Sequence, residues 1–251
     1  MQQFFLAIAF LFSACCQGLS QTQTAFDLRG KTQTLHVYGS GTKGSIILSS
    51  GDLGWAGLVV HIAESLSTQG YRVIGFDSRT YLSNFTSKNS VLSPQDVPRD
   101  FKSLIDFVSR EGQPRPVLAG VSEGAGLSVL AATEPEIQQS IQGVLGLGLP
   151  NRNELGWRWR DFTIWLTKKV PSEPTFLVEK IIHGVAPVPL AEIHSTHDEF
   201  LPLEEAKALL SLAREPKRMW VIESSNHRFS ENRAELDRSI LEALEWIQES
   251  R

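Results

Sequence analysis

Positions 117–126 read VLAGVSEGAG, an apolar run that enters a turn flanked by Gly120 and Gly124 and leaves it through small residues. The pattern Gly-x-Ser-x-Gly between a strand and a helix is typical of a tight turn that raises a serine hydroxyl above the end of a sheet. The positive end of the helix dipole then favours negative charge beside that hydroxyl. The stretch therefore predicts a strand, a strained turn and a helix, with Ser122 as a candidate nucleophile.

Length and composition are those of one globular domain. The chain has 251 residues, of which 41% are hydrophobic and 21% are charged, enough for a single α/β domain with a large core. The net charge of −4 leaves no basic surplus for a nucleic-acid partner. Neither a GxxxxGK[ST] loop nor a dinucleotide-type GxGxxG followed by an acidic residue occurs in the sequence. We therefore expect no nucleic acid and no nucleotide cofactor.

The first residues have the pattern of a targeting segment. Residues 4–12 are apolar but too few to span a bilayer stably, and the small residues Ser13 and Ala14 follow them. We expect a signal peptide over residues 1–20 and a single exported domain over residues 21–251, either periplasmic or secreted.

Both cysteines, Cys15 and Cys16, lie at the end of this segment. The preceding residues resemble a lipobox with Phe12 where leucine is usual, so a lipid anchor is an alternative to ordinary cleavage. The rest of the chain contains no cysteine. It therefore has no disulfide framework, no thiolate metal site and no cysteine nucleophile.

Short apolar runs alternate with helical patterns along most of the chain. The predicted strands are residues 34–38, 45–49, 71–76, 117–119, 141–149, 191–194 and 219–222. The first of these alternates weakly and predicts an edge strand, and the polar residues 80–92 predict a loop over one end of the sheet. Strands that alternate with helices, without a repeat or a linker, predict one mostly parallel, doubly wound α/β sheet with helices on both faces.

Residues with the chemistry of a nucleophile, a base and an acid follow predicted strands, where the reactive groups of such a sheet collect. A serine hydroxyl needs a base to accept its proton, and we expect His227, after the last strand, to be that base rather than a plain surface histidine. The base needs a carboxylate to orient it. We expect Asp198 to be this carboxylate, and its neighbour Glu199 is the rival for the role. The alternative role of Asp198 is the N-cap of the following helix.

Two backbone amides are candidates for an oxyanion site. A tetrahedral intermediate needs two such donors, one from Glu123 after the serine and one from Asp52 in the loop after an early strand. The alternative for that loop is a plain turn. We expect its residues Gly51 and Leu53 to contact the substrate, and the Glu123 side chain to face the substrate or to support the site.

Two further groupings have less specific patterns. His194 and His197 flank Asp198, but their spacing on a path from strand to loop does not place both rings on one face, so we expect no metal. Residues 157–169 mix Trp and Phe with Arg and Lys. This composition fits a lid or a membrane-surface contact, or an excursion that packs its aromatic rings on the sheet.

From residue 45 to the C-terminus the chain resembles the α/β-hydrolase superfamily, in which the triad has the order Ser…Asp…His. Within this range, the runs LSSGDLGW at 48–55 and GFDS at 75–78 are similar to motifs of the bacterial virulence VirJ/AcvB family, and Tyr81 and Asp100 fit its pattern. The sequence departs from that family at Leu53, which replaces a glycine. It also departs in the turn Gly-Val-Ser-Glu-Gly around Ser122, the nucleophile elbow, and in the residues around His227.

The resemblance implies an α/β-hydrolase domain over residues 21–251 that is exported to the periplasm. It implies that Ser122, Asp198 and His227 form the triad of an enzyme acting on an aminoacylated phospholipid such as lysyl-phosphatidylglycerol. It also implies that Asp52 and Asp77 face a cationic group of that substrate.

Residues and resemblance together predict a serine hydrolase that cleaves an ester or a related acyl bond of a small molecule or a lipid. The reaction passes through an acyl-enzyme and needs no cofactor. One alternative is a catalytically silent hydrolase fold that serves as a periplasmic binding or secretion partner, against which the Ser…Asp…His order argues. The other alternative is a serine peptidase.

Overall fold

The computed structural model describes residues 21–88, 90–110, 115–158 and 173–251. The predicted signal peptide with Cys15 and Cys16, and most of the aromatic and basic segment 157–169, lie outside these ranges. No helix in the described part of the chain is long and apolar enough to cross a membrane.

A central sheet of eight strands has the order β1-β2-β4-β3-β5-β6-β9-β10. Its strands are β1 (Thr22–Leu28), β2 (Lys31–Tyr38), β3 (Gly44–Ser49), β4 (Tyr71–Phe76), β5 (Val117–Val121), β6 (Gly143–Leu147), β9 (Leu190–Ser195) and β10 (Lys217–Ile222). The pairs β1–β2 and β2–β4 are antiparallel, and all the other pairs in this sheet are parallel. The predicted mostly parallel sheet is therefore confirmed.

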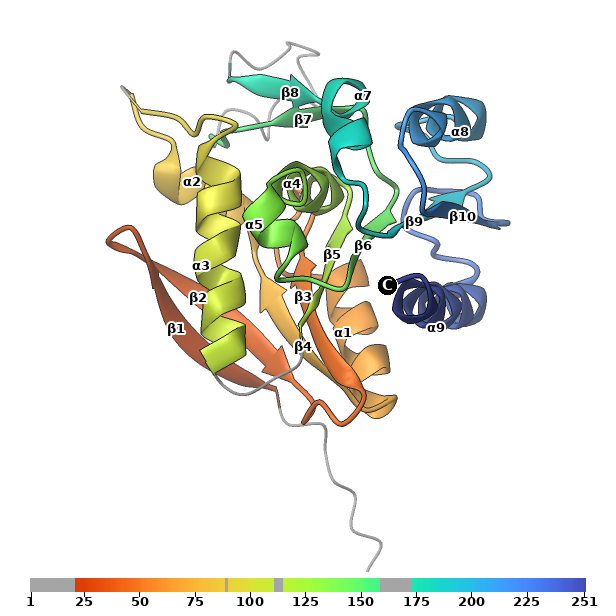
Figure 1. The fold of residues 1–251 in the computed structure, drawn as a ribbon, viewed down its shortest axis with the longest axis horizontal. Coiled ribbons are helices and arrows are strands. Elements are labelled where there is room, and N and C mark those ends of the chain that lie inside the picture. The colour runs from red at the N-terminus through yellow and green to blue at the C-terminus, as the bar shows by residue number, and fades with distance from the viewer. Residues whose placement is uncertain (1–20, 89, 111–114, 159–172) are drawn as a thin grey trace, which may run out of the picture.

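Helices cover both faces of this sheet (Figure 1). On one face lie α1 (Leu58–Thr68) and α9 (Arg233–Glu249), and on the other lie α3 (Asp96–Arg110), α4 (Glu123–Ala131) and α8 (Leu203–Ser211). The smaller elements are α2 (Ser78–Phe85), α5 (Pro135–Gln138), α7 (Val178–Ile181), the 3₁₀ turn Ile182–Gly184, and the two-stranded sheet of β7 (Arg152–Glu154) and β8 (Thr175–Leu177). The doubly wound architecture is thus as predicted.

The two helical layers enclose two apolar cores. Along the fully buried strand β3, Ile46 and Leu48 join the core under α1 and α9, whereas Ile47 joins the core under α3 and α4. This alternation follows from the two-residue period of a strand. It also explains why β3 and β5 are buried at every position, since both of their faces are covered.

Two local predictions were wrong. Residues 34–38 belong to β2, which is not an edge strand, because β1 pairs with it and forms the edge instead. Residues 80–92 do not form only a loop, because α2 covers the first part of this range. Its N-cap is Asp77, and it buries Tyr81 against Asp100 of α3, whose carboxylate accepts a hydrogen bond of 2.8 Å from the tyrosine hydroxyl.

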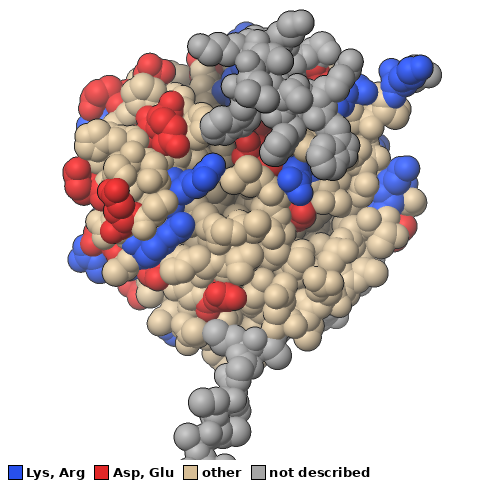
Figure 2. Space-filling model, turned by 180° about the vertical axis from the view of Figure 1, so that it is seen from behind, with Lys and Arg blue, Asp and Glu red and all other residues tan. Residues whose placement is uncertain are grey.

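Charges of both signs are intermixed on the face shown in Figure 2, and no continuous basic surface is visible there. This distribution agrees with the slightly negative net charge of −4.

Candidate active site

A strained turn joins β5 to α4 at Ser122, which has φ 51° and ψ −119°. Non-glycine residues rarely adopt positive φ, and where they do the strain is held by the surroundings. Here the Ser122 amide donates to the Leu147 carbonyl at 2.9 Å, and the Ser122 carbonyl accepts from the Ala125 amide at 2.8 Å. The turn is thus anchored to β6 on one side and to the first turn of α4 on the other.

Glycine is required on both sides of this serine. A Cβ on Gly120 would lie 2.2 Å from the backbone of Gly124, and a Cβ on Gly124 would lie 2.4 Å from the carbonyl oxygens of Ser49 and Ser50. These are backbone atoms in the core of the sheet, so neither can move aside cheaply. The two glycines of the motif therefore let α4 start directly over the ends of β3 and β5.

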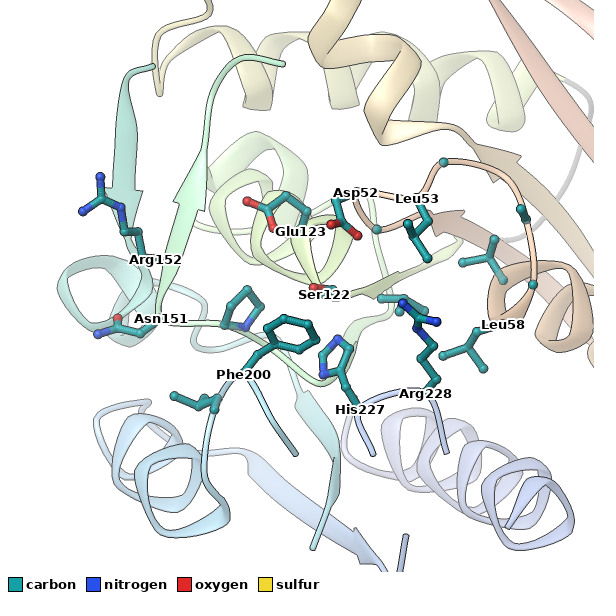
Figure 3. Close-up of a pocket in the computed structure, with 18 of the residues that line it drawn as sticks. Asp52, Leu53, Leu58, Ser122, Glu123, Asn151, Arg152, Phe200, His227 and Arg228 are labelled. Atoms are coloured by element: carbon teal, nitrogen blue, oxygen red, sulfur yellow. The ribbon is translucent and has the colours of Figure 1, made fainter. Parts of the chain in front are cut away.

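The loops after β9 and β10 bring Asp198 and His227 into contact. The Nδ1 of His227 lies 2.5 Å from Oδ2 of Asp198, and both side chains are buried. A carboxylate only accepts hydrogen bonds, so Nδ1 carries the proton and Nε2 is left as an acceptor. This Nε2 is buried and has no hydrogen-bond partner among the described residues. Figure 3 shows the ring pointing from its loop toward Ser122.

The Asp198 carboxylate is held by more than the histidine. Its Oδ1 accepts the amides of Phe200 at 2.8 Å and Leu201 at 3.0 Å. Burial alone raises the pKa of Asp198, but the hydrogen bond and charge of His227, together with these amides, outweigh burial and lower the pKa. Asp198 therefore stays ionised and keeps the imidazole in one tautomer.

Glu199, the rival of Asp198, has a different contact. Its carboxylate accepts the backbone amide of His227 at 2.6 Å and so fixes the loop rather than the ring. The ring itself lies against Gly148, where a Cβ would come within 2.4 Å of it, and Phe200 packs edge-on against it at 5.1 Å between centroids. The alternative role of Asp198, as the N-cap of the following helix, does not apply, because Pro202 is the N-cap of α8.

A cavity of about 590 Å³ opens above these residues (Figure 3). Its polar lining includes Asp52, Ser122, Glu123 and His227. Its apolar lining comes from the loop before α1, from α1 itself, from the end of β5 and from the loop after β9. The apolar lining residues include Leu53, Ala56, Leu58, Val59, Val121, Phe200 and Leu201. Leu53 is 47% exposed and Phe200 is 57% exposed, so the mouth of the cavity is apolar on two sides.

Two carboxylates lie on the same side of Ser122, opposite His227 (Figure 3). Glu123 and Asp52 both line the cavity, and Oε1 of Glu123 accepts the Glu154 amide at 2.8 Å. Burial, followed by the charges of Glu154 and Asp52, raises the pKa of Glu123 to about 7, against the lowering effect of that amide. The part of the cavity nearest the serine is therefore acidic, whereas Arg152 and Arg228 lie at its opposite ends (Figure 3).

The structure brings most of the predicted residues to this cavity. Gly51, Asp52 and Leu53 line it, in a turn closed by the Gly54 amide on the Gly51 carbonyl at 3.0 Å. Glu123 is the first residue of α4, where a backbone amide has no acceptor within its own helix and is free for a ligand. Both predicted oxyanion donors thus belong to residues that line the cavity with Ser122.

Asp77 is placed outside this cavity. Its carboxylate caps α2, accepting the Thr80 amide at 3.1 Å and the Thr80 hydroxyl at 2.9 Å. It lines a separate polar hollow with Gln33 and His36. The implied contact of Asp77 with a cationic group beside Ser122 has no support in this geometry.

Several residues at the site were not anticipated from the sequence. Phe200 and Arg228 line the cavity and lie close in sequence to Asp198 and His227. This closeness to predicted site residues is the one feature of the sequence that could have indicated them. Glu192 and His194 are buried behind Asp198. The sequence placed His194 four residues before Asp198 but did not indicate a contact between them, and it did not mark Glu192 at all. Over the ranges that the structure describes, no group of three or more His, Cys, Asp or Glu side chains is arranged to hold a metal ion.

Comparisons with known proteins give a family and related sequences for this chain. A family model described as "Bacterial virulence protein (VirJ)" matches residues 44–247. The chain is 26% identical over 170 residues to the uncharacterized protein YfhR of Escherichia coli O157:H7, a match that covers 64% of this chain and 55% of YfhR. It thus spans about half the length of the curated relatives it matches.

Solved structures share the fold at low identity. The α/β hydrolase GrgF from Penicillium sp. sh18 has a TM-score of 0.67 at 12% identity, over 92% of this chain and 99% of that chain. The monoacylglycerol lipase of Paleococcus ferrophilus has a TM-score of 0.62 at 16% identity, over 87% of this chain and 99% of that chain. These likenesses show that the protein has the α/β-hydrolase fold.

Proposed function

Because the chain belongs to the bacterial virulence protein VirJ family and has the α/β-hydrolase fold, we propose that it is a serine hydrolase that cleaves an ester bond. The observation that carries the proposal is the contact between Asp198 Oδ2 and His227 Nδ1, 2.5 Å apart. The Nε2 of the same ring has no partner within the described ranges and faces a strained serine in the same cavity. A buried acceptor nitrogen next to a serine hydroxyl is what a general base needs.

The proposed reaction has two halves. In the first, His227 Nε2 takes the proton of Ser122 as the serine oxygen attacks the ester carbon, and the amides of Glu123 and Asp52 bind the oxyanion. The intermediate collapses, and the leaving alcohol takes the proton back from His227. In the second half, His227 removes a proton from water as the water oxygen attacks the acyl-enzyme carbonyl. His227 then gives this proton to the departing serine oxygen, which releases the acid and restores the free serine. Asp198 stabilises the imidazolium in both halves.

We propose a lipid ester, and within that class an aminoacyl-phospholipid, as the substrate. The apolar mouth formed by Leu53 and Phe200 suits an acyl or glyceryl chain. The carboxylates of Glu123 and Asp52, beside the serine, suit an ammonium group on the acyl part of the ester. Such a substrate lies at a membrane surface, and the apolar residues 4–12 support export of the chain to reach it.

A fluorophosphonate probe tests the serine mechanism. We expect the wild-type protein to be labelled and the Ser122→Ala variant not to be labelled, with Ser103→Ala, an exposed serine on α3, as the matched control. Asp198→Asn is expected to lower kcat by about 10⁴-fold, because it leaves the imidazole in the wrong tautomer. Absence of labelling in the wild type would support the silent binding protein instead, and turnover of peptide amides without esters would support a peptidase.

A panel of matched esters tests the substrate. We expect kcat/KM to be higher for an aminoacyl ester than for a neutral acyl ester of the same length. Glu123→Gln should reduce that preference up to about fivefold, the effect of losing one ion pair partly exposed to water. Glu205→Gln, an exposed glutamate on α8, should leave the preference unchanged. Equal rates for both esters in the wild type would contradict the cationic specificity but not the serine mechanism.

A further inference from the structure

Two titratable side chains are buried behind the candidate acid, on the strand that leads to it. Glu192 and His194 lie two residues apart on β9 and are 2% and 0% exposed. Residues i and i+2 of a strand project on the same face, and His194 Nδ1 lies 3.4 Å from Glu192 Oε1. Neither residue lines the cavity. The ester chemistry described above uses neither of them, although burying two such groups is unfavourable unless they have partners.

Glu192 supports the surface on which His227 lies. Its Oε1 accepts the backbone amide of Leu149 at 2.9 Å, just after β6. The preceding residue, Gly148, has φ +61° and leaves the space that the ring of His227 fills. The second oxygen, Oε2, has no hydrogen-bond partner among the described residues, and a Cβ on Gly146 would lie only 2.3 Å from it. The carboxylate is therefore seated closely against β6 and its turn.

His194 supports the turn that carries Asp198. Its Nε2 lies 2.9 Å from the carbonyl oxygen of Leu201, and since a carbonyl only accepts, this nitrogen must carry a proton. The Leu201 amide in turn donates to Asp198. The same Nε2 lies 3.8 Å from Oδ2 of Asp198, the oxygen that binds His227. One buried ring thus contacts the backbone of the turn and the charge of the acid.

The other elements packed around His194 add no charged group within the described residues. Strand β10 places Val221 opposite it, and β6 places Gly146 opposite Glu192. Helix α8 turns Ala206, Leu209 and Leu210 toward this face. The charged groups that act on His194 are Glu192 on its own strand and Asp198 on the following turn, and His227 lies beyond Asp198.

We propose that Glu192 and His194 are a positioning pair that fixes the geometry of Asp198 and His227 and sets the pH range in which His227 acts as a base. This inference rests on the proposed serine-hydrolase function. Burial lowers the pKa of His194, but the hydrogen bond and charge of Glu192, the Leu201 carbonyl and Asp198 raise it more, so the net shift favours the charged ring. When His194 is charged, Asp198 interacts with two positively charged or hydrogen-bonding rings, so its attraction for a charged His227 is weaker.

The expected pH effect has a definite sign. If His194 loses its charge, the whole charge of Asp198 acts on His227 and stabilises the imidazolium, which is inactive as a base. The acidic midpoint of kcat/KM should therefore move to higher pH in His194→Gln, whose amide still donates to Leu201. Glu192→Gln should move it in the same direction, because the glutamine still accepts from Leu149 but no longer favours a charged His194.

The experiment compares pH profiles of kcat/KM on a neutral ester for the wild type, Glu192→Gln, His194→Gln and His194→Phe. His194→Phe removes the donor as well, and we expect it to lower kcat about tenfold or more, with His194→Gln recovering most of that loss. His197→Gln, an exposed neighbour, is the matched control and should change neither quantity. Unchanged acidic midpoints in both glutamine variants would overturn the proposal.

A second measurement is independent of turnover. The proton between His227 Nδ1 and Asp198 should give a strongly downfield NMR resonance because the hydrogen bond is short and charged. This resonance should shift in folded His194→Gln and Glu192→Gln and stay unchanged in folded Ser122→Ala. If the wild type does not label with a fluorophosphonate, the proposed function fails, whereas an identical resonance in all folded variants contradicts the positioning pair alone.

Discussion

Glu123 beside the candidate nucleophile makes the stability of the protein depend on pH in an unusual direction. Burial raises the pKa of this carboxyl from 4.5 to about 7, so the folded protein holds the proton more tightly than the unfolded chain does. In the wild type the Glu154 amide donates a hydrogen bond of 2.8 Å to the Glu123 carboxyl. Glu123→Gln removes the titrating group but keeps an oxygen that can accept this hydrogen bond. We therefore predict that the variant is more stable than the wild type at pH 8 and equally stable near pH 4.5.

The sign and size follow from proton linkage. Between pH 4.5 and about pH 7, the unfolded chain has lost the proton that the folded protein still binds, so the free energy of unfolding falls as pH rises. The slope is about 1.4 kcal/mol per pH unit, which gives a total of about 3 kcal/mol above pH 7. Glu123 lines an open cavity, and water there screens the charge, so this value is an upper limit.

Urea unfolding of both proteins at pH 4.5, 6 and 8 measures the effect. The difference in unfolding free energy between Glu123→Gln and the wild type should grow with pH and level off above pH 7, and Glu205→Gln should show no such trend. A difference that is the same at all three pH values would refute the reasoning, because it would mean that the substitution acts through packing. A variant that is less stable at pH 8 would mean that the Glu123 charge is stabilised in the fold.

Two further substitutions test the fold around the site. Gly120→Ala should destabilise the protein by more than about 3 kcal/mol in urea unfolding or prevent folding, because its Cβ would lie 2.2 Å from the Gly124 backbone; a loss under 1 kcal/mol would show that the elbow can relax. Tyr81→Phe should reduce stability by about 1–3 kcal/mol, since it removes a buried hydroxyl that donates to Asp100 at 2.8 Å. A neutral result would show that Arg29, which also binds Asp100, is sufficient.

The sequence predicted those features of the fold that depend on local pattern. The central strands are buried at every position and mostly apolar, as in residues 44–49 and 117–121, because both faces of the sheet are covered. The turn around Ser122 could be predicted because close backbone contacts at Gly120 and Gly124 leave no room for a side chain there, and this requirement appears in the sequence as a Gly-x-Ser-x-Gly pattern. Asp198 and His227 were found because strand ends in a parallel sheet converge, and the structure places their side chains in contact.

What the sequence missed depends on contacts between distant segments. Strand β1 is polar at most positions, with Phe26 and Leu28 as its buried residues, and it is ordered by pairing with β2 rather than by its own pattern. Helix α2 has three apolar or aromatic residues, Tyr81, Leu82 and Phe85, and is stabilised by the Asp77 cap and by its contact with α3. Glu192 and His194 look like ordinary strand residues, because their partners, Leu149 and Leu201, come from other loops.

The position of Glu123 links the fold to the proposed specificity. An elbow serine must be followed by the first residue of α4, whose amide faces the same space as the serine hydroxyl. The side chain of that residue is thereby held beside the reacting carbonyl carbon, whatever its chemistry.

In this protein the side chain at that position, Glu123, is a carboxyl whose pKa of about 7 lets it be neutral or charged near neutral pH. A bound ammonium group would favour the charged form and gain an ion pair, whereas a neutral acyl chain would favour the protonated form. The preference for a lysyl ester, whose side-chain ammonium stays charged up to about pH 10, over a neutral ester should therefore increase between pH 6 and pH 8 in the wild type. The contribution of that side-chain ammonium should stay constant in Glu123→Gln. A constant preference in both proteins would assign the cationic specificity to Asp52 alone.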